Sequence, residues 1–194
     1  MLDIYAFSRD FMSFSIGIDA SNIRSGGGLT HLIELLNSAD PVRDSFSCIY
    51  VWASHSTLSK LTSRPWLHKR WHPALDRGLF YRAWWQTYIL GPAVCSESCD
   101  VLLVLGGTFV TSFRPVVVVS QNLLPFEWNE LKRYGFSLIS IRLLLLRVAQ
   151  ARSFRMADGI IFLSSYARDR VLRSEKGINS KQNVIPHGVS SRFK

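Results

Sequence analysis

Short apolar runs recur along this chain, and most of them end in glycine or in small polar residues. They span residues 46–52, 100–105, 116–120 and 159–163. Nearly continuous apolar composition is typical of parallel strands that helices cover on both faces. Helical segments separate the runs: we expect one to stop at Gly91 and Pro92, one over residues 127–157 to break near Gly135, and one to end at Gly177. Strands that alternate with helices through right-handed crossovers form a doubly wound parallel sheet. We therefore predict an α/β fold, in one domain because 194 residues suit a single core.

Three consecutive glycines lie between the first strand and the first helix. Residues 15–18 are the end of a short strand, Gly26, Gly27 and Gly28 form a turn, and residues 29–36 place leucine and isoleucine on one helix face. Glycine lets a ligand come close to the backbone, and the free N–H groups at a helix N-terminus favour an anion. The turn lacks the spacing of a P-loop or of a dinucleotide site. We predict a phosphate-binding site here, and the alternative is a glycine turn with a purely structural role.

Polar or glycine residues follow four of the strands. They are Asp19, Gly106 with Gly107, Gln121 with Asn122, and Ser164 with Ser165. In a doubly wound sheet, ligands bind beyond the carboxyl ends of the strands, so one crevice can collect these groups. Neutral amides cannot act as general bases, but they can hydrogen-bond to hydroxyl groups. The alternatives are that the amides hold the turn at Pro125, that Asp19 braces a loop, and that a serine caps the next helix.

The chain carries a formal net charge of +9, which favours an anionic partner: a nucleotide sugar, a lipid phosphate, an anionic membrane surface or a nucleic acid. No helix-turn-helix, RNA-recognition or zinc-finger pattern accompanies the charge, so we do not expect nucleic acid. Cys48, Cys95 and Cys99 are odd in number and have no second ligand pair, which argues against a disulfide framework and a zinc site. We expect buried thiols in a reducing compartment and no metal.

The most apolar segment, residues 138–148, is shorter than the roughly 20 residues that span a bilayer, and it contains Arg142 and Arg147. Residues 1–14 contain charged side chains and do not resemble a signal peptide. We expect a cytoplasmic protein without a transmembrane helix.

Two basic regions each leave two interpretations open. Residues 64–82 contain five arginines or lysines interleaved with tryptophan and tyrosine, which suits either a membrane interface or an aromatic core with solvated arginines. Residues 131–157 contain six basic residues and no acidic one, which suits either attachment to anionic lipid or a buried crossover helix whose arginines extend outward.

Four motifs together resemble the amino-terminal domain of group 1 (family 4) glycosyltransferases of the GT-B fold. They are the glycine turn, Val-Val-Val-Val-Ser-Gln-Asn-Leu-Leu-Pro-Phe at 116–126, Gly-Ile-Ile-Phe-Leu-Ser-Ser-Tyr-Ala at 159–167, and Val-Ile-Pro-His-Gly-Val at 184–189. The resemblance implies that residues 15–189 form a Rossmann-like acceptor-side domain, preceded by an extension (1–14) and followed by the start of an interdomain linker (190–194). The stretch around Gln121 is similar to mannosyltransferase-like members that act in bacterial surface polysaccharide assembly.

Membership of this family implies transfer of a sugar from a nucleotide diphosphate donor to a glycan or lipid-linked acceptor, with retention at the anomeric carbon and without a metal or other cofactor. Gly26, Gly27 and Gly28 would face the donor diphosphate, and Gln121, Asn122 and Asp19 would bind the acceptor. In the family a second domain binds most of the nucleotide sugar through paired glutamates, and the sequence ends at Lys194 without that pair. The resemblance therefore implies the acceptor half of an enzyme, and the two basic regions leave open its peripheral attachment to the inner face of a membrane. The alternative is a non-catalytic module that docks a separate donor-binding chain or the membrane.

Overall fold

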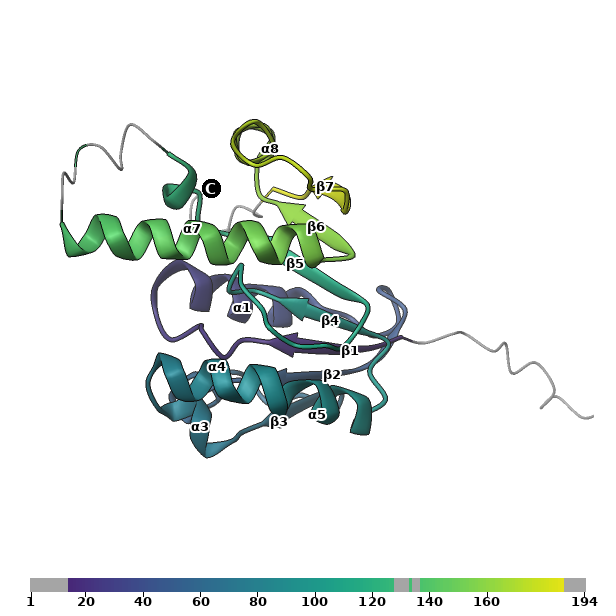
Figure 1. Ribbon diagram of the computed structural model, residues 1–194. Helices are drawn as coiled ribbons and strands as arrows, with labels where there is room; N and C mark the ends of the chain where they lie inside the picture. Colours follow the sequence, from purple (N-terminus) through teal and green to yellow (C-terminus); the bar gives the residue numbers. More distant parts are fainter. Residues whose placement is uncertain (1–13, 128–132, 134–136, 187–194) are drawn as a thin grey trace, which may run out of the picture.

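The computed structural model describes residues 14–127, 133 and 137–186 as one α/β unit (Figure 1). Its centre is an all-parallel, seven-stranded sheet with the order β3-β2-β1-β4-β5-β6-β7. The strands are β1 (Phe14–Asp19), β2 (Phe46–Trp52), β3 (Leu67–Arg70), β4 (Val101–Val104), β5 (Val116–Ser120), β6 (Gly159–Phe162) and β7 (Lys181–Val184). The predicted doubly wound, Rossmann-like fold is thus confirmed, and β2 and β5 have the predicted bounds.

Strand β1 lies at the point where the winding of the sheet reverses. It pairs with β2 on one side, Ile16 opposite Ile49, and with β4 on the other, Ile16 opposite Val101. Strands β2 and β3 are therefore added on one side of β1, and strands β4 to β7 are added on the other. The loops that follow β1 and β4 diverge beyond their carboxyl ends, which is where ligands bind in such sheets.

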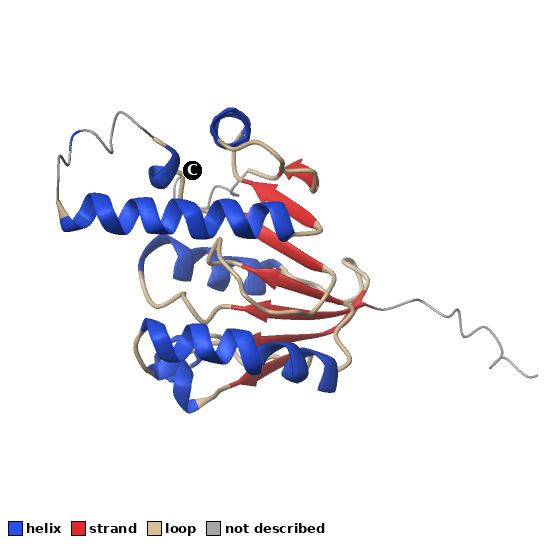
Figure 2. Ribbon diagram, viewed as in Figure 1, coloured by secondary structure: helices blue, strands red, loops and turns tan. Residues whose placement is uncertain are grey.

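Helices cover both faces of the sheet (Figure 2). On one face, α1 (Gly26–Ser38) and α2 (His55–Leu58) enclose a cluster that includes Leu32, Val51 and Leu105. The other face carries α3 (Pro73–Asp76), α4 (Leu79–Tyr88), α5 (Leu90–Ser96), α7 (Leu138–Met156) and α8 (Ser165–Ser174), with the 3-10 turn η1 (Leu124–Phe126). Two hydrophobic cores therefore lie on either side of one sheet.

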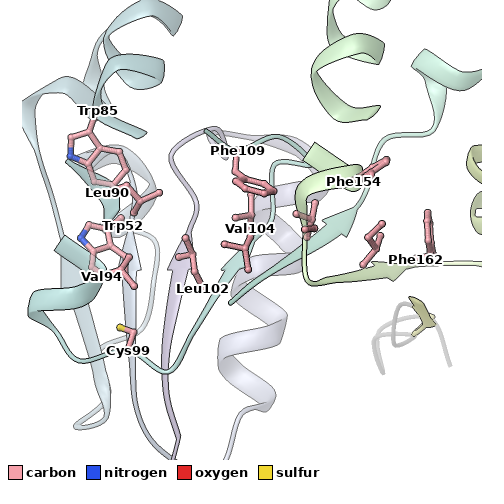
Figure 3. Close-up of a cluster of buried hydrophobic side chains, with 14 of the residues drawn as sticks. Trp52, Trp85, Leu90, Val94, Cys99, Leu102, Val104, Phe109, Phe154 and Phe162 are labelled. Atoms are coloured by element: carbon pink, nitrogen blue, oxygen red, sulfur yellow. The ribbon is translucent and has the colours of Figure 1, made fainter. Parts of the chain in front are cut away.

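The second core joins the helices of that face into one layer. Trp85 and Leu90 from α4 and α5 pack near Leu102 and Val104 of β4, and Phe154 of α7 continues the cluster toward Phe162 (Figure 3). All six side chains are almost fully buried. This cluster fixes α4 and α7 against the same face of the sheet.

Some expectations about helix ends and cysteines are wrong in detail. Gly91 and Pro92 do not end a helical region, because α4 ends at Tyr88 and Pro92 lies in the first turn of α5, where its missing N–H has no cost. Helix α8 ends at Ser174, before Gly177. Of the three cysteines, all free, Cys99 alone is buried, and Cys95 is exposed.

Several predicted features lie outside the described residues. They are the extension up to residue 13, the helix break near Gly135, and the chain from His187 onward, with the end of the last motif and the linker.

Candidate functional site

A groove of about 240 Å³ lies at the switch point of the sheet. Asn22 lines it from the loop after β1, and Thr108 and Phe109 line it from the loop after β4. Its walls are α4, through Gln86, and α7, through Arg152. Parallel strands bring these segments to one edge although they are far apart in the sequence.

Helix α1 begins at this edge with the three glycines. The prediction of a turn that precedes the helix is wrong here, because Gly26, Gly27 and Gly28 are themselves the first helical turn. Ser25 is the N-cap residue, but its side chain makes no capping hydrogen bond, and the first turn contains no acidic residue. Gly26 and Gly27 are exposed, and apart from their chain neighbours and the backbone of α1 itself, no atom lies within 4 Å of the position that a Cβ would occupy on either. The first N–H groups of a 13-residue helix are therefore accessible to an anion.

Gln121 lies against this turn. A Cβ on Gly28 would come 3.2 Å from Gln121 Oε1 and 3.0 Å from Ile23 Cδ1, so glycine is what permits the close approach. The Nε2 of Gln121 is buried and has no hydrogen-bond partner among the described residues. The structure thus brings together two of the predicted site groups, from the ends of β1 and β5.

Asn122, by contrast, is exposed, and its Oδ1 accepts a hydrogen bond from Leu124 N at 3.1 Å. This bond holds the start of η1, which is the structural role that sequence reasoning left open. Its contact with an acceptor stays a prediction.

Asp19 points into the protein. Its Oδ1 accepts a hydrogen bond from Ser21 N at 2.9 Å, and its Oδ2 accepts one from Gln86 Nε2 at 2.6 Å. Burial raises the pKa of the Asp19 carboxyl, and the hydrogen bonds from Ser21 and Gln86 and the nearby Arg82 only partly oppose this. Asp19 therefore ties the loop after β1 to α4, which supports the loop-bracing alternative, and an acceptor contact stays a prediction.

Two arginines that the sequence did not assign to this site fix the same loop. Arg82 Nη1 donates to Asn22 Oδ1 at 2.8 Å, and Arg24 Nη2 donates to the carbonyl of Leu75 at 2.5 Å. Burial, and then the neighbouring charge of Arg24, lower the pKa of Arg82. Two guanidinium groups therefore lie close together at the loop that joins β1 to α1. Arg82 and Gln86 are four residues apart in an otherwise largely apolar helix, a spacing that places them on one face and was the available signal.

The remaining strand ends have structural duties. A Cβ on Gly106 would lie 3.2 Å from Asn22 Cβ, so this glycine lets the two loops at the switch point pack closely. Ser164 is the N-cap of α8, and its Oγ accepts a hydrogen bond from Ala167 N at 3.1 Å, which confirms a serine cap.

Within the described ranges, no three histidine, cysteine, aspartate or glutamate side chains are grouped to hold a metal ion. Nor do the described helices include one long and apolar enough to cross a bilayer. The chain matches no model of a known protein family, and no curated protein matches its sequence.

Proposed function

We propose that the N-terminus of α1 binds the diphosphate of a nucleotide sugar and that this chain is the acceptor-side domain of a retaining GT-B glycosyltransferase. The observation that carries the proposal is the open first turn of α1 at the carboxyl edge of a doubly wound sheet, directly after a loop that contains Arg24 and that Arg82 holds through Asn22. A helix N-terminus and two cations both favour a negatively charged group.

The proposed chemistry needs little from this domain beyond position and electrostatics. Charge accumulates on the diphosphate as the glycosidic bond to the donor breaks, and backbone N–H groups aimed at that charge stabilise the transition state. Gln121 would orient the acceptor, because its amide lies next to Gly28 and Nε2 has a free donor. A second domain of the family type would carry most of the nucleotide contacts, with a mannose donor as one candidate.

The phosphate site can be tested with inorganic pyrophosphate as the probe. In heteronuclear NMR spectra of the full chain, pyrophosphate is expected to shift the amide signals of Gly26, Gly27 and Gly28 at constant ionic strength. Gly27→Asp should weaken the effect at least about tenfold, since it adds a carboxylate where the anion would lie, while negative charge at a helix N-terminus does not destabilise the helix.

Gly27→Asn is the matched control, because it adds a side chain of the same shape without the charge. The proposal predicts that Gly27→Asn retains pyrophosphate binding. Equal shifts in wild type and Gly27→Asp, or shifts spread over lysines and arginines far from α1, would show nonspecific anion binding and refute the site.

A further inference from the structure

The outward face of α4 is aromatic rather than polar. Phe80, Trp84 and Tyr88 recur at four-residue intervals and are 90%, 48% and 64% exposed, whereas Trp85, about 100° around the helix from Trp84, is buried. Tyr81 continues this face, and Arg77 stacks over its ring at 4.9 Å. An apolar cavity of about 520 Å³ lies beside these rings, between α3 and α4. The helix thus presents aromatic rings to the surroundings and not only to the core.

Helix α7 is also apolar on its outer side. Ile141, Leu144, Leu145 and Val148 are 49–66% exposed. At 100° per residue they fall within about one third of the helix circumference. Leu143 and Phe154 are buried on the other side, so both sides of this helix are apolar.

The two outer faces belong to one surface. Helices α4 and α7 lie on the same face of the sheet (Figure 1), and both line the groove at the switch point. Arg142 and Arg152 are exposed on α7. Neither helix contains an acidic residue. We call this surface the α4–α7 face.

We infer that the α4–α7 face docks on an anionic lipid bilayer. Tryptophan and tyrosine rings settle at the boundary between headgroups and acyl chains, and leucine, isoleucine and phenylalanine enter it more deeply. Arginine side chains at the same level meet the negative headgroups. An exposed apolar surface of this kind marks an interaction site, and its charge matches an anionic partner.

A second copy of the chain fits this face less well. A two-fold interface would bring the α4–α7 face of one copy against the same face of the other, and neither helix offers a carboxylate to pair with the arginines of the other copy. A bilayer supplies both the apolar layer and the negative charge.

Docking in this orientation would hold the groove at the switch point close to the membrane surface, because α4 and α7 form its walls. An acceptor carried on a lipid would then meet the site from the bilayer. The inference goes beyond the proposed phosphate site and does not rest on it.

Vesicle flotation of the full chain tests the inference. The probes are vesicles of phosphatidylcholine alone and of phosphatidylcholine with one third phosphatidylglycerol, neither of which contains a glycan, a nucleotide or pyrophosphate. We expect binding to the mixed vesicles that weakens at high salt and exceeds binding to the neutral ones. Arg142→Gln with Arg152→Gln should weaken it about 25-fold, about fivefold per arginine.

Matched variants separate a docking face from general charge and hydrophobicity. The double variant Lys60→Gln with Arg64→Gln has the same net charge as the double variant Arg142→Gln with Arg152→Gln, but its changes lie outside the α4–α7 face. The variant Val42→Gln removes an exposed apolar residue elsewhere. Leu144→Gln with Val148→Gln should reduce binding at least about tenfold while Val42→Gln does not. All these positions are exposed, so thermal unfolding should be nearly unchanged.

Equal loss of binding in the α7 and control variants would overturn the inference, and so would absence of binding to mixed vesicles. A concentration-dependent dimer that Leu144→Gln with Val148→Gln converts to a monomer would overturn it in favour of a second copy. Because the vesicles contain none of the proposed substrates, failure here leaves the pyrophosphate experiment unaffected, and the converse also holds.

Discussion

Alanine replacements of the three glycines at the start of α1 should change the free energy of unfolding in three different ways. Apart from its chain neighbours and the backbone of α1, no atom lies within 4 Å of a Cβ on Gly27. Gly27→Ala should therefore stabilise the protein by about 0.5 kcal/mol, because it favours helix and reduces the entropy of the unfolded chain. Gly26 has φ +69°. An alanine in that left-handed region costs about 1–2 kcal/mol, so Gly26→Ala should be destabilising by about 1 kcal/mol after the same entropic gain.

Gly28 gives the third outcome, because its neighbours leave little room. A Cβ would approach Ile23 Cδ1 to 3.0 Å and Gln121 Oε1 to 3.2 Å. Displacing them should more than offset the helical gain, for a net destabilisation of about 1 kcal/mol. In a Gln121→Ala background the amide is gone, so Gly28→Ala should cost at least about 0.5 kcal/mol less than in wild type.

Urea unfolding at fixed pH and salt measures all of these values, with an unchanged m-value as the check that the unfolded state is the same. Equal stabilities of Gly26→Ala and Gly27→Ala would show that the first turn does not need the left-handed conformation. If the cost of Gly28→Ala is the same with and without Gln121, then Gln121 does not lie against α1. Its place in the proposed site would then be refuted.

Three further predictions concern buried groups. The pKa of Asp19 is raised above 3.8 in the folded state. The free energy of unfolding of wild type, compared with that of Asp19→Asn, should therefore fall as the pH rises through the folded pKa. A difference in urea midpoints that does not change with pH would contradict this. Burial raises the pKa of Cys99 to about 11, so a thiol reagent at neutral pH should label exposed Cys95 quickly and Cys99 only after unfolding; equal labelling rates would be contrary evidence. Ser153→Ala should cost about 1–3 kcal/mol in thermal unfolding, because Phe109 N donates to Ser153 Oγ at 3.0 Å in a buried setting; a change below about 0.5 kcal/mol would show that another acceptor replaces the hydroxyl.

The sheet could be predicted because its strands obey a local rule. Residues 46–52 and 116–120 are apolar except for one serine each, and a strand covered on both faces needs a nearly continuous apolar composition wherever it lies in the sequence. Helix limits were less predictable, since they depend on neighbours: α4 stops at Tyr88 and α5 starts at Leu90 so that Trp85 and Leu90 can both enter the core. Proline in a first helical turn fits either a stop or a start.

The candidate site was only half predictable, for a similar reason. The glycines and Gln121 follow strands, so topology alone brings them to one edge. Arg24 and Arg82 were not found, because their importance comes from a contact across the loop that no short motif contains. A residue that holds a loop from another helix can lie at any distance from that loop along the sequence.

Helix α7 shows a limit of periodicity itself. A hydrophobic stripe identifies the buried side of a helix only when the other side is polar. In α7, Leu143 and Phe154 face the core while Leu145 and Val148 face outward, so the two sides cancel and the sequence indicates no direction. The exposed apolar side of such a helix marks an interaction surface. The absence of a clear stripe in a long, basic, apolar helix is therefore evidence for a second contact surface, and here the contact that the charge favours is a lipid one.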